Sequence, residues 1–499
     1  MTAKRKKLLT ELLALREEFD LAKKRYGEFL EKADPSYAYA AENLLNYLVF
    51  RNADRKELQD ELTSQGLSSL RWAESHVREN LNKVVGWLDA DDTESRTSLP
   101  DAESAMEELK ARNCRLFSSG ELCPERFIMV TLDGKAHREA SDYVKLLEAG
   151  MNSARINTGH DGPAEWDRMI GEIRKASDLT GKPCSVYFDL AGPKIRIASI
   201  YSKHGDPKKK YYFKKGHRVF ITEESFGPGF PRVVSLQIGT SGILQHLEKG
   251  QRILFDDGVA GAEITSVEES GVLVEITHTD GSDQKIKPEK GVLFPGLTVE
   301  LPAVTEADLN HLNLFAEKVD IIGVSFVHKA TEIQELITYT KEKEWDHLGV
   351  VAKIETIRAF EYLPEILFSL MECKKSGVMI ARGDLGLEVG FERLAEVQEE
   401  ILWLCEAALM PTIWATQVLE KLTKRGVASR AEISDAALSV RAECVMLNKG
   451  AYILESVVAL SKILTKMSEH QKKKRPQMRK LNLATRFFEE KNPVGNTRP

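Results

Sequence analysis

Short apolar runs alternate with amphipathic stretches from residue 127 onward, and this alternation is the feature that most constrains the fold. The runs are rich in β-branched residues, which favours strands, and the stretches between them have helical spacing. Strands separated by helices are joined by right-handed crossovers and run parallel. Eight such units predict a (β/α)8 TIM barrel, with an open doubly wound sheet as the alternative on pattern alone. The predicted strands are 127–132, 153–157, 185–190, 320–326, 349–355, 377–383, 411–416 and 444–450, and the predicted helices are 138–149, 165–180, 306–317, 331–344, 357–371, 391–409, 430–442 and 454–468.

About 130 residues separate the third predicted strand from the fourth, which is too long for a barrel loop. Within this interval, segments such as HRVFITEES and GVLVEITHTDGS alternate apolar and polar residues at strand period, with Gly and Asp at turns. We predict a small inserted all-β domain at 198–292, which divides the barrel domain into 119–197 and 293–475. An insertion that follows a barrel strand emerges over the catalytic face, so a lid is its expected role.

Residues 1–118 are predicted to form an N-terminal α-helical domain. Leu8, Leu12, Leu15 and Phe19 recur at helical spacing, and Asp34-Pro35 is expected to separate the first helix from the second. The polar stretch 89–104 indicates an exposed connection, and 476–499 is predicted to be a basic tail. The helices carry no catalytic constellation, which favours a packing or dimerisation module and a homo-oligomer.

Composition excludes several classes of protein. The formal net charge of -6 gives no overall attraction to nucleic acid or to acidic membranes, so neither is an expected partner. No run approaches the roughly 20 apolar residues of a membrane span, and acidic residues interrupt the apolar start, which predicts a cytoplasmic protein. Six cysteines without a CxxC pair predict reduced thiols in the core rather than disulfides or a metal site.

Polar residues gather at the predicted carboxyl ends of the strands, where TIM barrels place their active sites. Glu355 and Asp384 end neighbouring strands, and two carboxylates suit a Mg²⁺ that takes its other ligands from water and substrate. Strand alternation places Lys353 on the same face as Glu355. A lysine beside a metal and arginines suits phosphoryl transfer, although a structural salt-bridge network is the plain alternative. The polar strand ends are Arg155, Asn157, Asp189, Ser325, Lys353, Glu355, Arg382, Asp384, Thr416 and Asn448.

Several segments resemble the pyruvate kinase family, in family order over residues 127 to 465. EAGMNSARINTGH (148–160) is similar to its EAGMNVARLNFSHG segment, and FDLAGPKIR (188–196) resembles LDTKGPEIR. FDDGVAGAEI (255–264) is similar to the turn of the family's lid. The segments KIE, ARGDLG, ATQ and SRAEISDAAL follow at their family positions, and together they are highly specific.

The resemblance implies transfer of a phosphoryl group from phosphoenolpyruvate to ADP, giving pyruvate and ATP. It implies that Glu355 and Asp384 hold Mg²⁺, with Mn²⁺ as a substitute, and that Lys353 stabilises the phosphoryl group in transit. Thr416 helps to deliver a proton, and the backbone of Ala381, Arg382 and Gly383 seats the substrate carboxylate. The residues that it assigns to phosphate and nucleotide are Arg155, Asn157, His160, Arg196 and Lys290.

Two departures from the family pattern bear on mechanism. At the positions that coordinate K⁺, Asn157 and Asp189 remain, but Gly159, Leu190 and Lys194 replace oxygen-bearing residues, which resembles the K⁺-independent branch. MLNKGAYILES replaces MLSGETAKGDYP, so a Ser and a Glu are missing beside Lys449, and His328 stands where the family has Arg. The sequence also ends about 30 residues after the last barrel helix, so we expect no C-terminal effector domain.

Two other functions remain open at this point. A catalytically weak barrel that senses phosphoenolpyruvate or nucleotide and signals through the N-terminal helices is favoured by the altered loop at Asn448. The intact set of Lys353, Glu355, Asp384 and Thr416 opposes it. A metal-dependent aldolase of the phosphoenolpyruvate/pyruvate class keeps the fold and changes the reaction, and the nucleotide-side residues oppose it.

Overall fold

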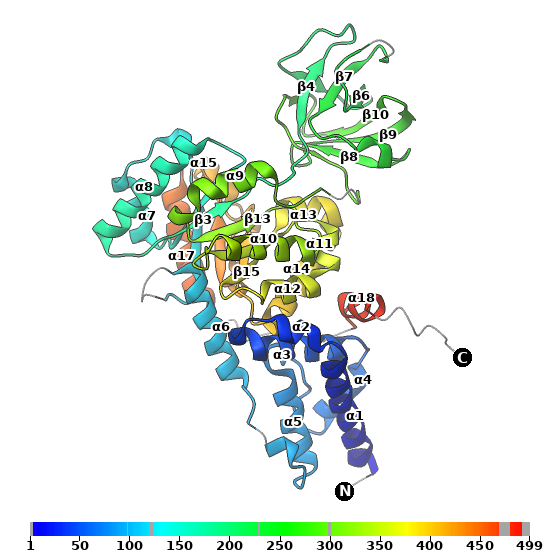
Figure 1. Ribbon diagram of the computed structural model, residues 1–499, viewed down its shortest axis with the longest axis vertical. Coiled ribbons are helices and arrows are strands. Elements are labelled where there is room, and N and C mark those ends of the chain that lie inside the picture. Colours follow the sequence, from blue (N-terminus) through cyan, green and yellow to red (C-terminus); the bar gives the residue numbers. More distant parts are fainter. Residues whose placement is uncertain are drawn as a thin grey trace. The chain divides into compact units, whose positions relative to one another are not determined.

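A computed structural model describes residues 3–96, 98–118, 123–227, 230–297, 301–468 and 480–491. The chain divides into two compact units (Figure 1). The first contains the N-terminal helices, the barrel and the C-terminal helix, and comprises Met1–Ala191, Glu306–Arg382 and Leu394–Pro499. The second comprises Gly192–Thr305 together with Gly383–Arg393, and the predicted insertion 198–292 lies inside it.

Eight parallel strands close into a barrel in the order β1-β17-β16-β15-β14-β13-β3-β2, which confirms the predicted (β/α)8 fold and excludes the open sheet. Every strand is buried or nearly so, as expected for runs covered on both faces. The strands are β1 (Phe127–Thr131), β2 (Ser153–Asn157), β3 (Ser185–Asp189), β13 (Ile321–Val324), β14 (Gly349–Ile354), β15 (Ser376–Ala381), β16 (Thr412–Ala415) and β17 (Cys444–Leu447).

Helices follow the strands at the predicted places. The predicted helix 357–371 is divided in two at Tyr362, because Pro364 lacks an amide hydrogen and lies in the first turn of the second part. The helices are α7 (Ala140–Ala149), α8 (Pro163–Thr180), α9 (Glu306–Phe315), α10 (Ala330–Glu342), α11 (Ile357–Glu361), α12 (Leu363–Leu370), α13 (Arg382–Val389), α14 (Phe391–Ala407), α15 (Glu420–Arg425), α16 (Arg430–Leu438) and α17 (Ile453–Ser468).

The N-terminal helices pack against the barrel and close its amino-terminal end. Leu116 and Phe117, at the end of α6, join the core inside the barrel, and the ring centres of Phe117 and Phe127 lie 5.2 Å apart. Burying such side chains contributes about 1.5–3 kcal/mol each. These helices are α1 (Ala3–Arg25), α2 (Gly27–Lys32), α3 (Ala38–Arg51), α4 (Lys56–Ser64), α5 (Val77–Leu88) and α6 (Ala102–Phe117).

The contacts of these helices with the barrel are specific. Tyr37 bonds its hydroxyl to Ser376 Oγ at 3.0 Å, and Asn43 donates to the Ala407 carbonyl oxygen at 2.8 Å. The packing module is therefore attached to its own barrel, while a role in oligomer formation stays a prediction. The first helix ends at Arg25, earlier than expected, and Asp34 instead caps the short turn Pro35–Tyr37 that precedes α3.

The segment predicted to be a basic tail contains a packed helix, α18 (Asn482–Glu490). Leu483, Ala484 and Phe487 are buried on one face, and Phe487 lies 5.9 Å from Phe368 of α12. Arg486 also pairs with Glu365 at 2.5 Å. The charge of the preceding run KKKRPQMRK concealed this short apolar face, and most of that run lies outside the described residues.

The prediction that all six cysteines are reduced is wrong for one pair. Cys114 near the end of α6 forms a disulfide with Cys123, with their Cα atoms 5.4 Å apart. Cys123 packs against the barrel core, and sequence spacing does not reveal that the end of α6 meets the approach to β1 there. The other four are free, and burial raises the pKa of the Cys184 and Cys405 thiols to about 12.

The second unit contains the predicted all-β insertion. Seven strands form a sheet in the order β12-β8-β9-β10-β6-β7-β4, and β11 pairs with β5 in a second, two-stranded sheet. Alternate residues of these strands fill one apolar core, which explains the period-2 pattern. The strands are β4 (Ile197–Tyr201), β5 (Tyr211–Phe213), β6 (Arg218–Thr222), β7 (Val234–Ile238), β8 (Arg252–Phe255), β9 (Ala260–Glu268), β10 (Gly271–Thr279), β11 (Gln284–Ile286) and β12 (Val292–Leu293).

Within the described ranges, no helix has both the length and the apolar character that crossing a bilayer requires.

Candidate active site

Four charged side chains meet at the carboxyl ends of β2, β3 and β14. Arg155 donates from Nε to Asp189 Oδ2 at 2.7 Å, and Lys353 Nζ lies 3.2 Å from the other oxygen of the same carboxylate. Lys353 also lies 3.0 Å from Glu355 Oε1, as strand alternation predicts for two residues on one face. All four are buried, and their formal charges cancel.

Lys353 is held by more than its carboxylate partners. It donates to Ser325 Oγ at 2.7 Å, and that hydroxyl donates in turn to the Leu190 carbonyl oxygen at 2.6 Å. Burial disfavours the charged lysine, but Asp189 and Glu355 outweigh burial and raise the pKa of Lys353 above its ordinary value. The barrel therefore keeps a fixed cation at this point, with its three N–H donors directed at Ser325, Asp189 and Glu355.

Hydrogen bonds from uncharged partners to the charged groups complete the orientation of this cluster. The Phe326 amide donates to Glu355 Oε2 at 2.7 Å, and Phe326 has a φ of 53°, a left-handed conformation that is rare for a bulky residue. Arg155 also donates from Nη1 to Thr131 Oγ1 at 2.9 Å. Thr131 ends β1, and the sequence interpretation overlooked it because the run FIMVTL reads as uniformly apolar.

Arg382 and Thr416 lie together after β15 and β16. The Arg382 guanidinium donates to the Ala415 carbonyl oxygen at 3.0 Å, pairs with Asp435 and lies 4.7 Å from the centre of the Trp414 ring. The Arg382 side chain is thus engaged by contacts within the barrel. Thr416 has a φ of 65°, a strain often found at functional residues.

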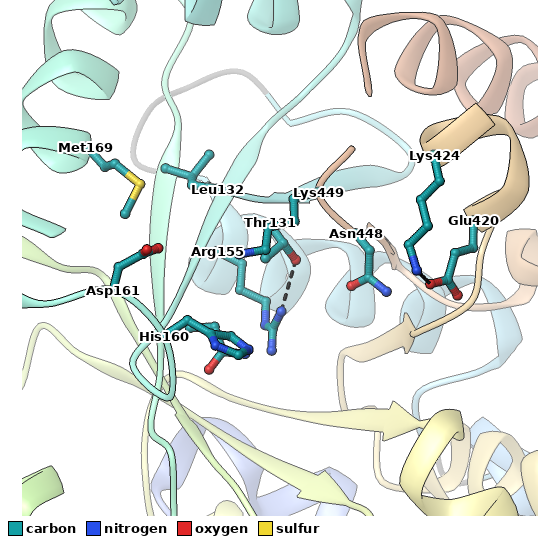
Figure 2. A pocket seen from close by; sticks show the side chains of 11 residues that line it. Thr131, Leu132, Arg155, His160, Asp161, Met169, Glu420, Lys424, Asn448 and Lys449 are labelled. Carbon is teal, nitrogen blue, oxygen red and sulfur yellow. Dashed lines mark hydrogen bonds and ion pairs between the residues drawn. The ribbon is translucent and has the colours of Figure 1, made fainter. Parts of the chain in front are cut away.

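A cavity of about 220 Å³ opens beside Arg155 (Figure 2). Asn157 and His160 line it, as do Asn448 and Lys449 of the altered loop after β17. Lys449 lies 3.5 Å from Asp133 at the rim. Glu420 and Lys424, which pair with each other, and Met169 were missed by the sequence interpretation because they lie on helices rather than at strand ends. The full lining is Thr131, Leu132, Arg155, Asn157, His160, Asp161, Met169, Glu420, Lys424, Asn448 and Lys449.

The barrel positions of the predicted monovalent-cation region offer few free oxygens. Leu190 is buried and apolar, and Gly159 has no side chain. Asn157 Oδ1 accepts from the Gly159 amide at 3.0 Å, and the Asp189 carboxylate faces Arg155 and Lys353. The Asp189 carboxylate is thus already paired with two cationic side chains.

The remaining predicted residues belong to the second unit. Lys194 Nζ lies 3.7 Å from Asp384 Oδ1 and 3.3 Å from Asp257 Oδ1. Lys290 donates to Asp256 at 2.8 Å, and Arg196 donates to the Glu289 carbonyl oxygen at 2.9 Å. Asp256 and Asp257 have positive φ values, and so does the following Gly258, which together form a tight turn. This unit thus brings together Lys194 and Asp384, a contact that the sequence interpretation did not foresee.

Glu355 of the first unit and Asp384 of the second unit each offer carboxylate oxygens, which hard divalent cations prefer as ligands. Among the described residues, no group of three or more His, Cys, Asp and Glu side chains could enclose a metal.

Comparisons with known proteins agree with this geometry. The family described as "Pyruvate kinase, barrel domain" matches residues 125–457. Pyruvate kinase from Dictyostelium discoideum is 33% identical over 344 residues, covering 67% of this chain and 65% of the relative. Pyruvate kinase from Geobacillus stearothermophilus is 31% identical, covering 66% of this chain and 55% of the relative. Pyruvate kinase PKLR from Rattus norvegicus is 29% identical, covering 65% and 57%.

The chain thus spans between 55% and 65% of the length of these three relatives. Because the matched residues include all eight barrel strands and the inserted β unit, and make up more than half of the chain, the chain belongs to the pyruvate kinase family.

Proposed function

We propose that this protein transfers the phosphoryl group of phosphoenolpyruvate to ADP, giving pyruvate and ATP. The observation that carries the proposal is the buried cluster of Arg155, Asp189, Lys353 and Glu355 at the strand ends. Its two cations are fixed before any substrate arrives. Preorganised cations that face a developing negative charge lower the barrier of phosphoryl transfer without reorganising during the reaction.

The reaction breaks the bond between phosphorus and the enol oxygen and forms a bond to the terminal phosphate oxygen of ADP. Lys353 stabilises the charge on the phosphoryl oxygens, and Arg155 orients the same group from its anchor on Asp189 and Thr131. Asn157, His160, Arg196 and Lys290 hold the nucleotide and its phosphates. Glu355 of the first unit and Asp384 of the second unit would hold Mg²⁺, with Mn²⁺ as a substitute, and the bound ion would neutralise phosphate charge.

The enolate left by phosphoryl transfer must gain a proton at its methylene carbon. We assign the delivery of this proton to Thr416, which would act through a water molecule. Thr416 directly follows β16 and has a left-handed backbone conformation. The backbone of Ala381, Arg382 and Gly383 seats the carboxylate of the substrate. The Arg382 side chain supports this role, because its guanidinium donates to the Ala415 carbonyl oxygen and to the Asp435 carboxylate and so fixes the turn.

The protein is proposed to work without K⁺. The support is chemical: Leu190 and Gly159 offer no side-chain oxygen, and Lys194 brings a fixed positive charge to the unit that carries Asp384. A lysine ammonium can supply the same charge as a monovalent cation, though without its exchangeable ligands.

The test is ATP formation from phosphoenolpyruvate and ADP with Mg²⁺, for the native chain, for Lys353→Met and for Lys145→Met. Lys145 is an exposed lysine of α7 that pairs with Asp142 and serves as the matched control. We expect turnover by the native chain and the control, and a loss of about 10²–10³-fold in Lys353→Met. A folded native chain that binds phosphoenolpyruvate without turnover would favour the sensing barrel instead.

A further inference from the structure

The β unit carries a groove of about 660 Å³, here called the lid groove, that the proposed reaction does not use. Lysines, arginines and tyrosines dominate its lining, and Val233 and Val234 add an apolar floor. The lining residues are Ser202, Lys203, Lys208, Lys210, Tyr211, Tyr212, Gly216, His217, Arg218, Arg232, Val233 and Val234.

The residues around the lid groove carry a net charge that is opposite in sign to the net charge of the whole chain. Residues 203–218 hold seven Lys and Arg residues and one Asp, a formal charge of +6, whereas the whole chain carries -6. Lys203, Lys208 and Arg232 are exposed, and none lies within 4.0 Å of a carboxylate oxygen among the described residues. Positive charge that is not neutralised by the protein is available to an anionic ligand.

An exposed aromatic ring stands among these cations. In β5, Tyr211 and Phe213 point toward the core and Tyr212 points outward, opposite Lys285 of β11. Tyr212 is 41% exposed, and Lys210 Nζ lies 5.4 Å from the centre of its ring. An aromatic plane flanked by lysines is the arrangement on which single-stranded nucleic acids stack their bases.

The frame around the groove is held by specific contacts. The Tyr211 hydroxyl bonds to His217 Nδ1 at 3.2 Å, and the Gly216 amide donates to the Ile276 carbonyl oxygen at 2.8 Å. Ser202 and Lys203 follow the carboxyl end of β4, whereas Lys194 and Arg196 precede its amino end. Within this unit, the groove and the residues proposed for phosphoryl transfer therefore lie at opposite ends of one strand.

We propose that the lid groove binds a single strand of nucleic acid, with phosphates on the lysines and a base on Tyr212. A hollow surface does not fit a flat membrane, and separated exposed cations suit a repeating polyanion better than one enclosed phosphate. This proposal departs from the expectation of no nucleic-acid partner, because the net charge of the whole chain does not reveal a local excess of positive charge.

The test is fluorescence anisotropy of the full chain with labelled 12-nucleotide oligo(dT) and oligo(U). Four phosphate contacts predict that the logarithm of the binding constant falls with the logarithm of salt concentration with a slope of about -3. A fourfold rise in salt should then weaken binding about fiftyfold. The two probes decide whether DNA or RNA is preferred, and preference for either supports the proposal.

Two variants separate charge from stacking. Lys208→Gln with Lys210→Gln should make the slope shallower by about 1.4, because two phosphate contacts are lost. Tyr212→Leu should weaken binding about tenfold with the slope unchanged, and Tyr212→Phe should restore binding. Lys6→Gln with Lys24→Gln, two exposed lysines of α1, is the matched control and should have no effect.

Three results of these experiments would overturn the proposal. These are no binding of either oligonucleotide at low salt, equal loss of binding in the α1 control, or unchanged binding in Tyr212→Leu. Equal competition by inorganic polyphosphate or by vesicles of acidic phospholipid would also overturn it, since neither carries bases.

Discussion

The Lys353 ammonium lies 3.2 Å from Asp189 Oδ1 in the buried end of the barrel, where Asp189 also binds Arg155. One carboxylate thus fixes both cations proposed to act on the phosphoryl group. Loss of a single charge here would leave its buried partners without compensation.

Asp189→Asn is expected to lower both stability and activity. Removing one partner of a buried ion pair typically costs about 3–5 kcal/mol. The pKa of Lys353 is raised in the folded state above its ordinary value of 10.5, so its stabilising effect is complete below that value and is lost as pH rises through the folded-state pKa. Asp189→Asn should lower this pKa and bring alkaline unfolding to lower pH, measured by urea unfolding at several pH values.

Asp133→Asn is the control for this experiment. Asp133 pairs with Lys449 at 3.5 Å, but Lys449 is 38% exposed, so the change should cost less than about 1 kcal/mol. Equal effects of the two substitutions would contradict a special role for the buried pair.

Activity is expected to be independent of K⁺. Replacing K⁺ with tetramethylammonium should leave the rate of ATP formation nearly unchanged, because Leu190 and Gly159 supply no oxygen and Lys194 supplies the charge. Lys194→Glu should lose activity in tetramethylammonium and regain part of it with K⁺. A fall of the native rate by about half or more without K⁺ would argue against the assignment.

Glu443→Gln is expected to stabilise the protein at alkaline pH. Burial raises the pKa of Glu443 to about 7, although Arg126 and the Thr412 amide oppose the shift. The folded state therefore binds this proton more tightly than the unfolded state, and stability falls as pH rises from about 4.5 to about 7. Glutamine cannot ionise and can still accept from the Thr412 amide.

The gain in the free energy of unfolding should reach about 3 kcal/mol at pH 8 and fall to about 1 kcal/mol at pH 5. Thermal unfolding at the two pH values measures it, with Glu489→Gln on the exposed face of α18 as control. A gain that is the same at both pH values would show that ionisation of Glu443 is not its cause.

Gly323→Ala is expected to destabilise the barrel. A Cβ atom at Gly323 of β13 would lie 2.2 Å from the Tyr187 hydroxyl oxygen, inside the buried core. Overpacking of this kind costs about 1–3 kcal/mol or more. Gly171→Ala in α8 meets nothing within 4 Å and should stabilise by about 0.5–1 kcal/mol. Chemical denaturation of the two variants gives the comparison, and an unaffected Gly323→Ala would show that Tyr187 can move aside.

The repeating units of the barrel and the lid strands could be predicted from sequence because they depend on periodicity among near neighbours. The runs that end at Asn157, Asp189 and Ile354 were recognised within one or two residues. Lys353 and Glu355 were placed on one face for the same reason, since side chains alternate along a strand. Departures from the family pattern, such as Leu190 in place of an oxygen-bearing residue, could also be recognised from the sequence alone.

Tertiary structure alone decided which distant residues became partners. The pairing of Lys353 with Asp189, of Arg382 with Asp435 and of Cys114 with Cys123 depends on where separate segments meet. The packing of α18 also depends on tertiary structure, because its apolar face is buried against α12. In the same way, Lys208 and Arg232 come from separate segments and both line the lid groove. Periodicity specifies the face of an element, but contact between elements is set by closure of the barrel and packing of the whole core, which no local pattern contains.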